Sequence, residues 1–147
     1  MTIELTPAQY ETLLKLVYLG EWMSNGIRIE EERDGRTAQA AQYFYSYASE
    51  AGASTLIEYD AQGREYIPTR ELEEDTDVTR FRDEYDAEVF WDELVERLSM
   101  RDMMQMYGDQ QWAGGTLSQQ TEQQRQYSEK YAVEFEQNGV ENLVLKG

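Results

Sequence analysis

The chain has 147 residues, of which 40% are hydrophobic, and its 30 acidic and 13 basic residues give a formal net charge of -17. This length and apolar content suffice for a core without covalent staples, so we expect a single compact domain over residues 1–147. Cysteine and histidine are both absent from the sequence. Their absence excludes disulfides, thiol chemistry, zinc sites built on these residues and histidine-based acid–base catalysis.

A first helix is predicted to begin at Pro7, because the residues around it fit the usual start of a helix. Thr6 is a good N-cap, proline suits the first helical position, and Gln9 completes a capping box with Thr6. The Asn25-Gly26 pair either ends this helix or lies within it. Apolar residues form an arc wide enough to predict packing on several sides: Tyr10, Leu13, Leu14, Leu16, Val17, Tyr18, Leu19, Trp22 and Met23.

A second helix is predicted from Thr37 to Gly52. The Asp34-Gly35 pair before it indicates a turn, and threonine is a common N-cap. Tyrosines at positions 43, 45 and 47 cannot all lie on one face of a helix, so at least one of them should be exposed. The expected inner stripe consists of Ala41, Phe44, Ala48 and Ala51.

A small β-hairpin is predicted after this helix. Residues 55–59 and 64–68 are rich in β-prone side chains and flank a turn-forming segment at 60–63. This arrangement is typical of two antiparallel strands joined by a short turn. Pro68 fits the end of an edge strand, because proline has no N–H to donate to a neighbouring strand.

The longest predicted helix has Thr76 or Asp77 as its N-cap and runs roughly to Tyr107, just before Gly108. Within it, Asp102 lies next to Arg101 and is expected to form a half-buried ion pair with it. The predicted apolar face of this helix consists of Phe81, Tyr85, Val89, Phe90, Leu94, Leu98 and Met106.

A last helix is predicted over Ser118–Gln137, since the Asn138-Gly139 pair that follows favours a left-handed C-cap. We expect residues 112–116 to form a loop before it and Val140–Leu145 to form a short terminal strand. The predicted fold class is therefore mainly α, with a four-helix core and a small β-hairpin or minor sheet.

The acidic residues are concentrated in one part of the sequence. Residues 71–96 contain twelve acidic residues and two basic ones. Such a segment repels nucleic acids and anionic membranes and attracts cations. We therefore expect a basic protein partner rather than nucleic acid or a membrane. Exposed tyrosines would also allow a homo-oligomer.

Four of these acidic residues recur at intervals of four: Glu84, Glu88, Asp92 and Glu96. This spacing places them on one face of the predicted long helix, where like charges cost about 0.2–0.5 kcal/mol per pair. The row is a solvated face, a docking surface for a basic partner or half of a metal site. Trp112, in the predicted loop, is a candidate contact for the same partner because tryptophan often anchors interfaces.

Carboxylates from two segments offer an alternative, a magnesium site. Magnesium prefers oxygen ligands, and one helix face cannot surround the ion. Magnesium is the only cofactor that the sequence suggests, and no complete catalytic motif accompanies it. The candidate ligands are Glu30, Glu31, Glu71, Glu74 and Asp77.

The sequence thus predicts an acidic, non-catalytic interaction or regulatory module, such as an inhibitor, an antitoxin-like factor or a mimic of nucleic-acid charge. We expect it in the cytoplasm, because residues 1–6 lack a basic signal-peptide start and no apolar run could span a bilayer. The first alternative is a magnesium-dependent helical nucleotide phosphohydrolase. The second is a protein whose acidity reflects adaptation to a high-salt cytoplasm, which its 3 lysines against 10 arginines would fit.

Overall fold

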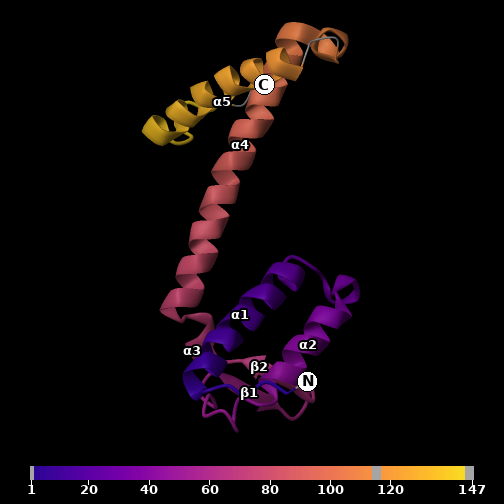
Figure 1. Cartoon of the computed structure of the whole chain (residues 1–147), viewed down its shortest axis with the longest axis vertical. Helices are drawn as coiled ribbons and strands as arrows, with labels where there is room; N and C mark the ends of the chain where they lie inside the picture. Colours follow the sequence, from indigo (N-terminus) through magenta and orange to yellow (C-terminus); the bar gives the residue numbers. More distant parts are fainter. Residues whose placement is uncertain (1, 114–116, 145–147) are drawn as a thin grey trace. The chain divides into compact units, whose positions relative to one another are not determined.

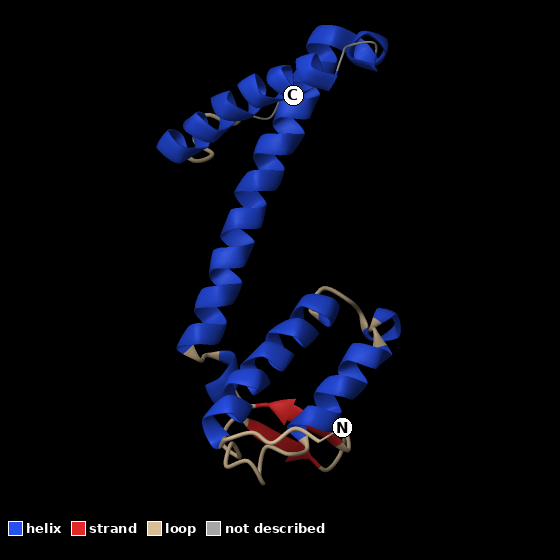
Figure 2. Cartoon of the chain, viewed as in Figure 1, coloured by secondary structure: helices blue, strands red, loops and turns tan. Residues whose placement is uncertain are grey.

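A computed structural model describes the backbone of residues 2–113 and 117–144, and the side chains of these residues except 109–113, 117–120 and 123. The described part is mainly α-helical with one small antiparallel hairpin, which confirms the predicted fold class (Figures 1 and 2). In chain order the elements are α1 (Pro7–Asn25), the 3-10 turn η1 (Glu30–Glu32), α2 (Gly35–Tyr45), β1 (Ile57–Asp60), β2 (Glu65–Pro68), α3 (Arg70–Glu73), α4 (Thr76–Ala113) and α5 (Leu117–Asn138).

The chain forms two compact units, and the boundary between them lies within α4. Unit 1 ends at Asp83 and contains α1, α2, the hairpin, α3 and the first residues of α4. Unit 2 begins at Glu84 and contains the rest of α4 together with α5. The single domain that we predict for residues 1–147 stays a prediction.

Helix α1 begins as its sequence predicts. The backbone N–H of Gln9 donates to Thr6 Oγ1 at 3.3 Å, and the N–H of Thr6 donates to Gln9 Oε1 at 3.0 Å, which forms the capping box. The helix ends at Asn25, so the Asn25-Gly26 pair terminates it. The prediction that it packs on several sides is wrong for unit 1. A narrow stripe is buried there, whereas Leu13, Leu16 and Met23 are exposed.

Helix α2 begins earlier and ends sooner than predicted. Asp34, not Thr37, is the N-cap, because Asp34 Oδ1 accepts a hydrogen bond from the N–H of Arg36 at 2.9 Å. The Thr37 hydroxyl instead donates to the Asp34 carbonyl at 2.9 Å. After Tyr45 the chain turns through residues 46–52 instead of continuing to Gly52 as a helix. Tyr45 is buried while Tyr43 and Tyr47 are exposed, which confirms that at least one of the three tyrosines reaches the surface.

The hairpin forms where it was predicted. Strands β1 and β2 pair antiparallel, with Ile57 opposite Pro68 and Asp60 opposite Glu65. The Gln42 side chain of α2 fixes the hairpin, because its Nε2 donates to the Tyr66 carbonyl at 2.7 Å and its Oε1 accepts from the Tyr66 N–H at 2.8 Å.

One continuous apolar core holds unit 1 together. It joins α1, α2, the hairpin and α3, with the first turn of α4 closing it. At its edge Lys15 Nζ lies 2.8 Å from Asp75 Oδ2, so α1 is ionically linked to the start of α4. The buried core residues are Tyr10, Leu14, Tyr18, Ala41, Tyr45, Ala48, Ala53, Leu56, Ile57, Leu72 and Val78.

Helix α4 is preceded by the short helix α3, which was not predicted. Asp75 caps α4 one residue before the predicted cap, since its Oδ1 accepts from the N–H groups of Asp77 at 3.0 Å and Val78 at 3.3 Å. The predicted break occurs at Gly108, whose φ of 65° is non-helical. The helix then resumes as far as Ala113, so the prediction of a loop at Trp112 is wrong, and residues 114–116 lie outside the described part.

Helix α5 ends at Asn138, and Gly139 adopts a φ of 55°, as its C-cap signal predicts. The terminal strand predicted after it is not formed over residues 140–144, which turn so that the N–H of Leu143 donates to the Val140 carbonyl at 3.0 Å. Leu145 lies outside the described residues.

In unit 2 helix α5 folds back from the end of α4 and lies at an oblique angle to it (Figure 1). Ser99 and Met103 of α4 and Tyr131 and Phe135 of α5 are its buried residues in the described part of the chain. The predicted apolar face of α4 is therefore only partly correct. Tyr85, Val89, Phe90 and Met106 are exposed in unit 2 and Phe81 is exposed in unit 1. The neighbouring Trp91 does contact α5, since its ring lies 5.6 Å from that of Phe135.

Candidate functional site

The four carboxylates predicted to form a row do so on α4 in unit 2. Glu84, Glu88, Asp92 and Glu96 are all exposed. The segment from Glu84 to Glu96 contains six acidic residues and no basic one, over a helix length of about 18 Å. We call these four residues the acidic row. The side chain of Trp112, the fifth predicted contact, lies outside the described part of the structure.

The five candidate magnesium ligands do not converge. In the part of the chain that the structure describes, there is no group of three or more carboxylates able to hold a metal ion. Glu31 is exposed on η1. The magnesium site therefore stays a prediction that the geometry does not favour. The other four carboxylates contact different groups: Glu30 with Arg33, Glu71 with Thr55, Glu74 with Arg70, and Asp77 with Arg80 and Lys15.

A polar cluster joins α4 to α5 in the middle of unit 2. Arg101 donates from Nε and Nη2 to Asp102 Oδ1 at 2.9 and 2.7 Å, which confirms the predicted half-buried pair. The Tyr131 hydroxyl donates to Asp102 Oδ2 at 2.5 Å and accepts from Arg101 Nη2 at 3.0 Å. Lys130 Nζ lies 3.9 Å from Asp102 Oδ2. These four residues are the polar cluster, and they bring together two helices around one carboxylate.

The electrostatics of the polar cluster favour an ionised Asp102. Partial burial raises the pKa of this carboxyl, but the hydrogen bonds from Tyr131 and Arg101 and the nearby cations outweigh burial, so its pKa lies below the ordinary value. Burial and the adjacent carboxylate raise the pKa of Tyr131. At neutral pH Asp102 is therefore the acceptor and Tyr131 the donor in their hydrogen bond.

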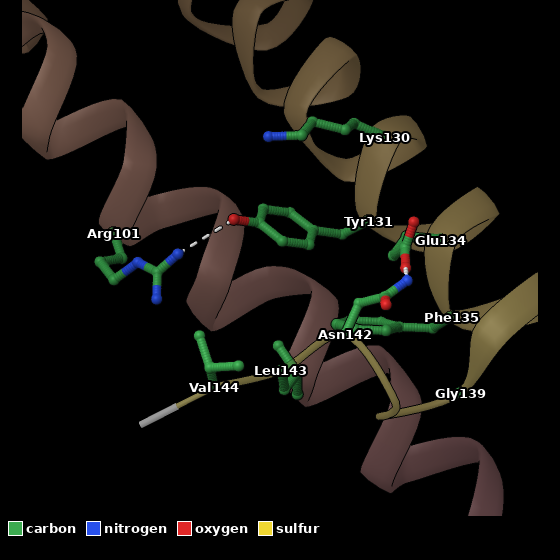
Figure 3. Close-up of a pocket in the computed structure, with 9 residues that line it drawn as sticks. All are labelled: Arg101, Lys130, Tyr131, Glu134, Phe135, Gly139, Asn142, Leu143 and Val144. Atoms are coloured by element: carbon green, nitrogen blue, oxygen red, sulfur yellow. Dashed lines mark hydrogen bonds between the residues drawn. The ribbon is translucent and has the colours of Figure 1, made fainter. Parts of the chain in front are cut away.

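A cavity of about 360 Å³ opens beside the polar cluster (Figure 3). Arg101 comes from α4, Lys130 to Phe135 come from α5, and the segment after Gly139 covers another side. Sequence reasoning found the Arg101–Asp102 pair because the two are neighbours in the chain. It missed Tyr131 and the cavity, because 29 residues separate Tyr131 from Asp102 and no local pattern connects them.

Unit 1 has a second concave surface, an apolar groove of about 690 Å³. Its walls come from the N-terminal segment, α1 and the end of α2, with Ile3, Leu13 and Tyr43 among the exposed residues that line it. The hydroxyl groups of Tyr43 and Tyr47 hydrogen-bond to each other at 2.9 Å along its edge. Glu50 is its charged lining residue, and Thr2 and three tyrosines add polar groups to a mainly apolar lining.

Comparison of the chain with protein-family models, curated proteins and solved structures finds no match. Over the described residues, no helix is both long enough and apolar enough to cross a membrane. The function of this chain is therefore inferred from its own geometry and charge.

Proposed function

We propose that the chain is a non-catalytic interaction module that binds a basic protein partner through the acidic row of α4. The chain would act in the cytoplasm as an inhibitor, an antitoxin-like factor or a mimic of nucleic-acid charge. The observation that carries this proposal is the exposed surface from Glu84 to Glu96, where six acidic residues occur without a basic one.

The charge of this surface is suited to attracting a cationic partner. The nearest arginine along α4, Arg97, forms its ion pair with Glu93 at 2.7 Å, outside the acidic row. A surface of one sign accelerates the encounter with an oppositely charged partner and disfavours partners of the same sign. The acidic row therefore supports selection by charge.

Apolar side chains beside the acidic row supply contact area. Tyr85 and Val89 lie at helical positions within or next to the acidic row, and both are exposed in unit 2, Tyr85 by 50%. Aromatic residues are enriched in the centres of protein interfaces, where they contribute more than rim charges do. A partner with basic residues around an apolar centre would match this surface.

Charge reversal on the acidic row tests the proposal. We expect the triple variant E84K/E88K/D92K to bind a fluorescent decalysine peptide at least about tenfold more weakly, since each exposed ion pair contributes about 0.2–1 kcal/mol. Fluorescence anisotropy at low and moderate salt measures the affinity, and circular dichroism checks that the helices remain.

The matched control reverses three exposed carboxylates elsewhere: Glu31, Glu58 and Glu136. The variant E31K/E58K/E136K changes the net charge by the same amount, and we expect it to weaken binding only slightly. Equal weakening by both triple variants would show that the peptide responds to diffuse charge. That result would contradict the acidic row as a site and favour adaptation to high salt.

A further inference from the structure

The cavity beside the polar cluster is lined by no residue of the acidic row, and it plays no part in the proposed function. Its volume of about 360 Å³ is within the range of sites that hold small molecules. All its lining residues belong to unit 2 (Figure 3). They present two cations, one carboxylate and an apolar wall, which is an unusual combination in a unit with so much negative charge.

One side of the cavity is cationic. Arg101 uses Nε and Nη2 for Asp102 and Tyr131, so Nη1 has no hydrogen-bond partner among the described residues. Lys130 Nζ is 3.9 Å from Asp102, beyond hydrogen-bond distance, and lies 5.1 Å from the centre of the Tyr131 ring. Two cations thus share one carboxylate, and both are lining residues of the cavity with donors that this carboxylate does not use.

The carboxylate of the cavity, Glu134, is held apart from these cations. Lys130 and Glu134 are four residues apart on α5, a spacing that commonly produces an ion pair. Instead the Lys130 ammonium points toward α4, while Glu134 Oε1 accepts from Asn138 at 3.0 Å and Asn142 at 2.6 Å (Figure 3). Glu134 Oε2 has no hydrogen-bond partner in the described structure. The cavity therefore has separate positive and negative sides.

An apolar wall lies between and below these charges. Phe135 contributes its ring from α5, and Leu143 and Val144 contribute aliphatic side chains from the segment after the helix (Figure 3). Leu143 and Val144 are both exposed, so part of their apolar surface faces solvent. A ligand with an aliphatic part would cover this surface and gain the free energy of burying it.

We propose that this cavity binds a free α-amino acid with an aliphatic side chain. Its carboxylate would accept hydrogen bonds from Arg101 and Lys130, its ammonium group would donate to Glu134, and its side chain would contact the apolar wall. A simple anion would meet the Glu134 carboxylate, and a simple cation would meet Arg101 and Lys130. A zwitterion matches both sides, because each of its charges forms a charge-assisted hydrogen bond.

Titration of the full-length, ¹⁵N-labelled chain with L-leucine tests the site by NMR. We expect saturable shifts of amide signals within residues 130–144. Two analogues each lack one charge: leucinamide has no carboxylate, and 4-methylpentanoate has no ammonium group. Each should bind at least about tenfold more weakly, the loss of one hydrogen bond between charged groups. The absence of saturable shifts with leucine, or equal affinity for either analogue, would overturn the proposal.

Substitutions at the two sides of the cavity give an independent test. Lys130→Met and Glu134→Gln should each weaken leucine binding about tenfold, and Glu134→Gln keeps an oxygen able to accept from the two asparagines. Arg97→Met is the control, since Arg97 is exposed outside the cavity and its loss changes the charge as Lys130→Met does. Arg101 stays unchanged because it also holds Asp102 and Tyr131. Unaltered leucine affinity in E134Q, or equal weakening by Arg97→Met, would overturn the proposal.

Discussion

The two units of this chain are held together in different ways. Unit 1 buries apolar side chains from α1, α2, the hairpin, α3 and the start of α4, and its ion pair Lys15–Asp75 lies at the edge of that core. Unit 2 buries few side chains in its described part, and its two helices are joined by the polar cluster around Asp102. Apolar burial depends little on pH, whereas a cluster around a carboxylate depends on ionisation. Asp75 at the edge of unit 1 and Asp102 in unit 2 both have a pKa below the ordinary value. Because Asp102 joins the two helices of unit 2, whereas unit 1 has a larger apolar core, ionisation should contribute a larger share of the stability of unit 2.

The largest expected effect is in the core of unit 1. Leu14 is completely buried, so Leu14→Ala should lower the free energy of unfolding by about 3–5 kcal/mol through lost burial and a cavity. The neighbouring change Leu13→Ala should cost less than about 1 kcal/mol, because Leu13 is 36% exposed. Urea unfolding followed by circular dichroism measures both.

Amide hydrogen exchange shows which helices lose protection in the Leu14→Ala variant. If the units are independently stable, amides of α2 should lose protection in this variant while amides of α5 keep theirs. Equal loss of protection in both helices would mean that the whole chain unfolds cooperatively. That outcome would remove the contrast between the units and support the single domain that the sequence predicts.

The second effect concerns the link between α4 and α5. Tyr131→Phe removes the hydroxyl that donates to Asp102, so we expect unit 2 to lose about 1–3 kcal/mol of stability. Tyr127→Phe is the matched control one turn earlier on α5, since its hydroxyl has no hydrogen bond among the described residues. Exchange rates of α5 amides measure the loss. Equal rates in the two variants would show that the polar cluster contributes nothing.

The smallest effect is the pH dependence that Asp102 should give to unit 2. Its pKa in the folded state lies below its ordinary value, so the ionised form stabilises the fold. This contribution is fully present above the unfolded pKa of about 3.9 and is lost as the pH falls through the lower, folded-state pKa. The stability advantage of the natural chain over Asp102→Asn should therefore be constant near neutral pH and shrink below about pH 4.

Asp92→Asn is the control for this pH dependence, because it removes the same charge from the exposed acidic row. It also relieves repulsion from Glu88 and Glu96, so at neutral pH this variant should be as stable as the natural chain or slightly more stable. Unfolding measured at several pH values separates the two cases. An advantage over Asp102→Asn that did not change with pH would contradict an ionised, hydrogen-bonded Asp102.

Local signals predicted many of the element boundaries. The capping box at Thr6, the hairpin turn, the break at Gly108 and the end of α5 at Asn138 all depend on residues close together in the chain. Where two such signals lay close together, the boundary predicted from them was wrong. Asp34 and Thr37 are both good N-caps, and Asp34 caps α2 because its carbonyl and carboxylate both serve the first turn.

Some local expectations were wrong because burial is not a local property. The spacing of Tyr85 and Phe90 predicts an apolar face, yet both are exposed in unit 2. The terminal strand failed for a similar reason, since residues 140–144 turn beside α5 and line the cavity instead of pairing with a strand. A sequence pattern shows which residues favour burial, but it does not show which of them pack against another element.

The sequence by itself determined the charge, the excluded chemistries, the mainly α class with its hairpin and the acidic row, because composition and helical spacing suffice for these. Only the tertiary structure decided that Tyr131 meets Asp102 and that Glu134 turns from Lys130 toward Asn142. It also decided that, among the described residues, no three or more carboxylates come together to hold a metal ion. Contacts between distant segments depend on how helices pack, and packing follows from the complementarity of whole surfaces rather than from any short run of residues.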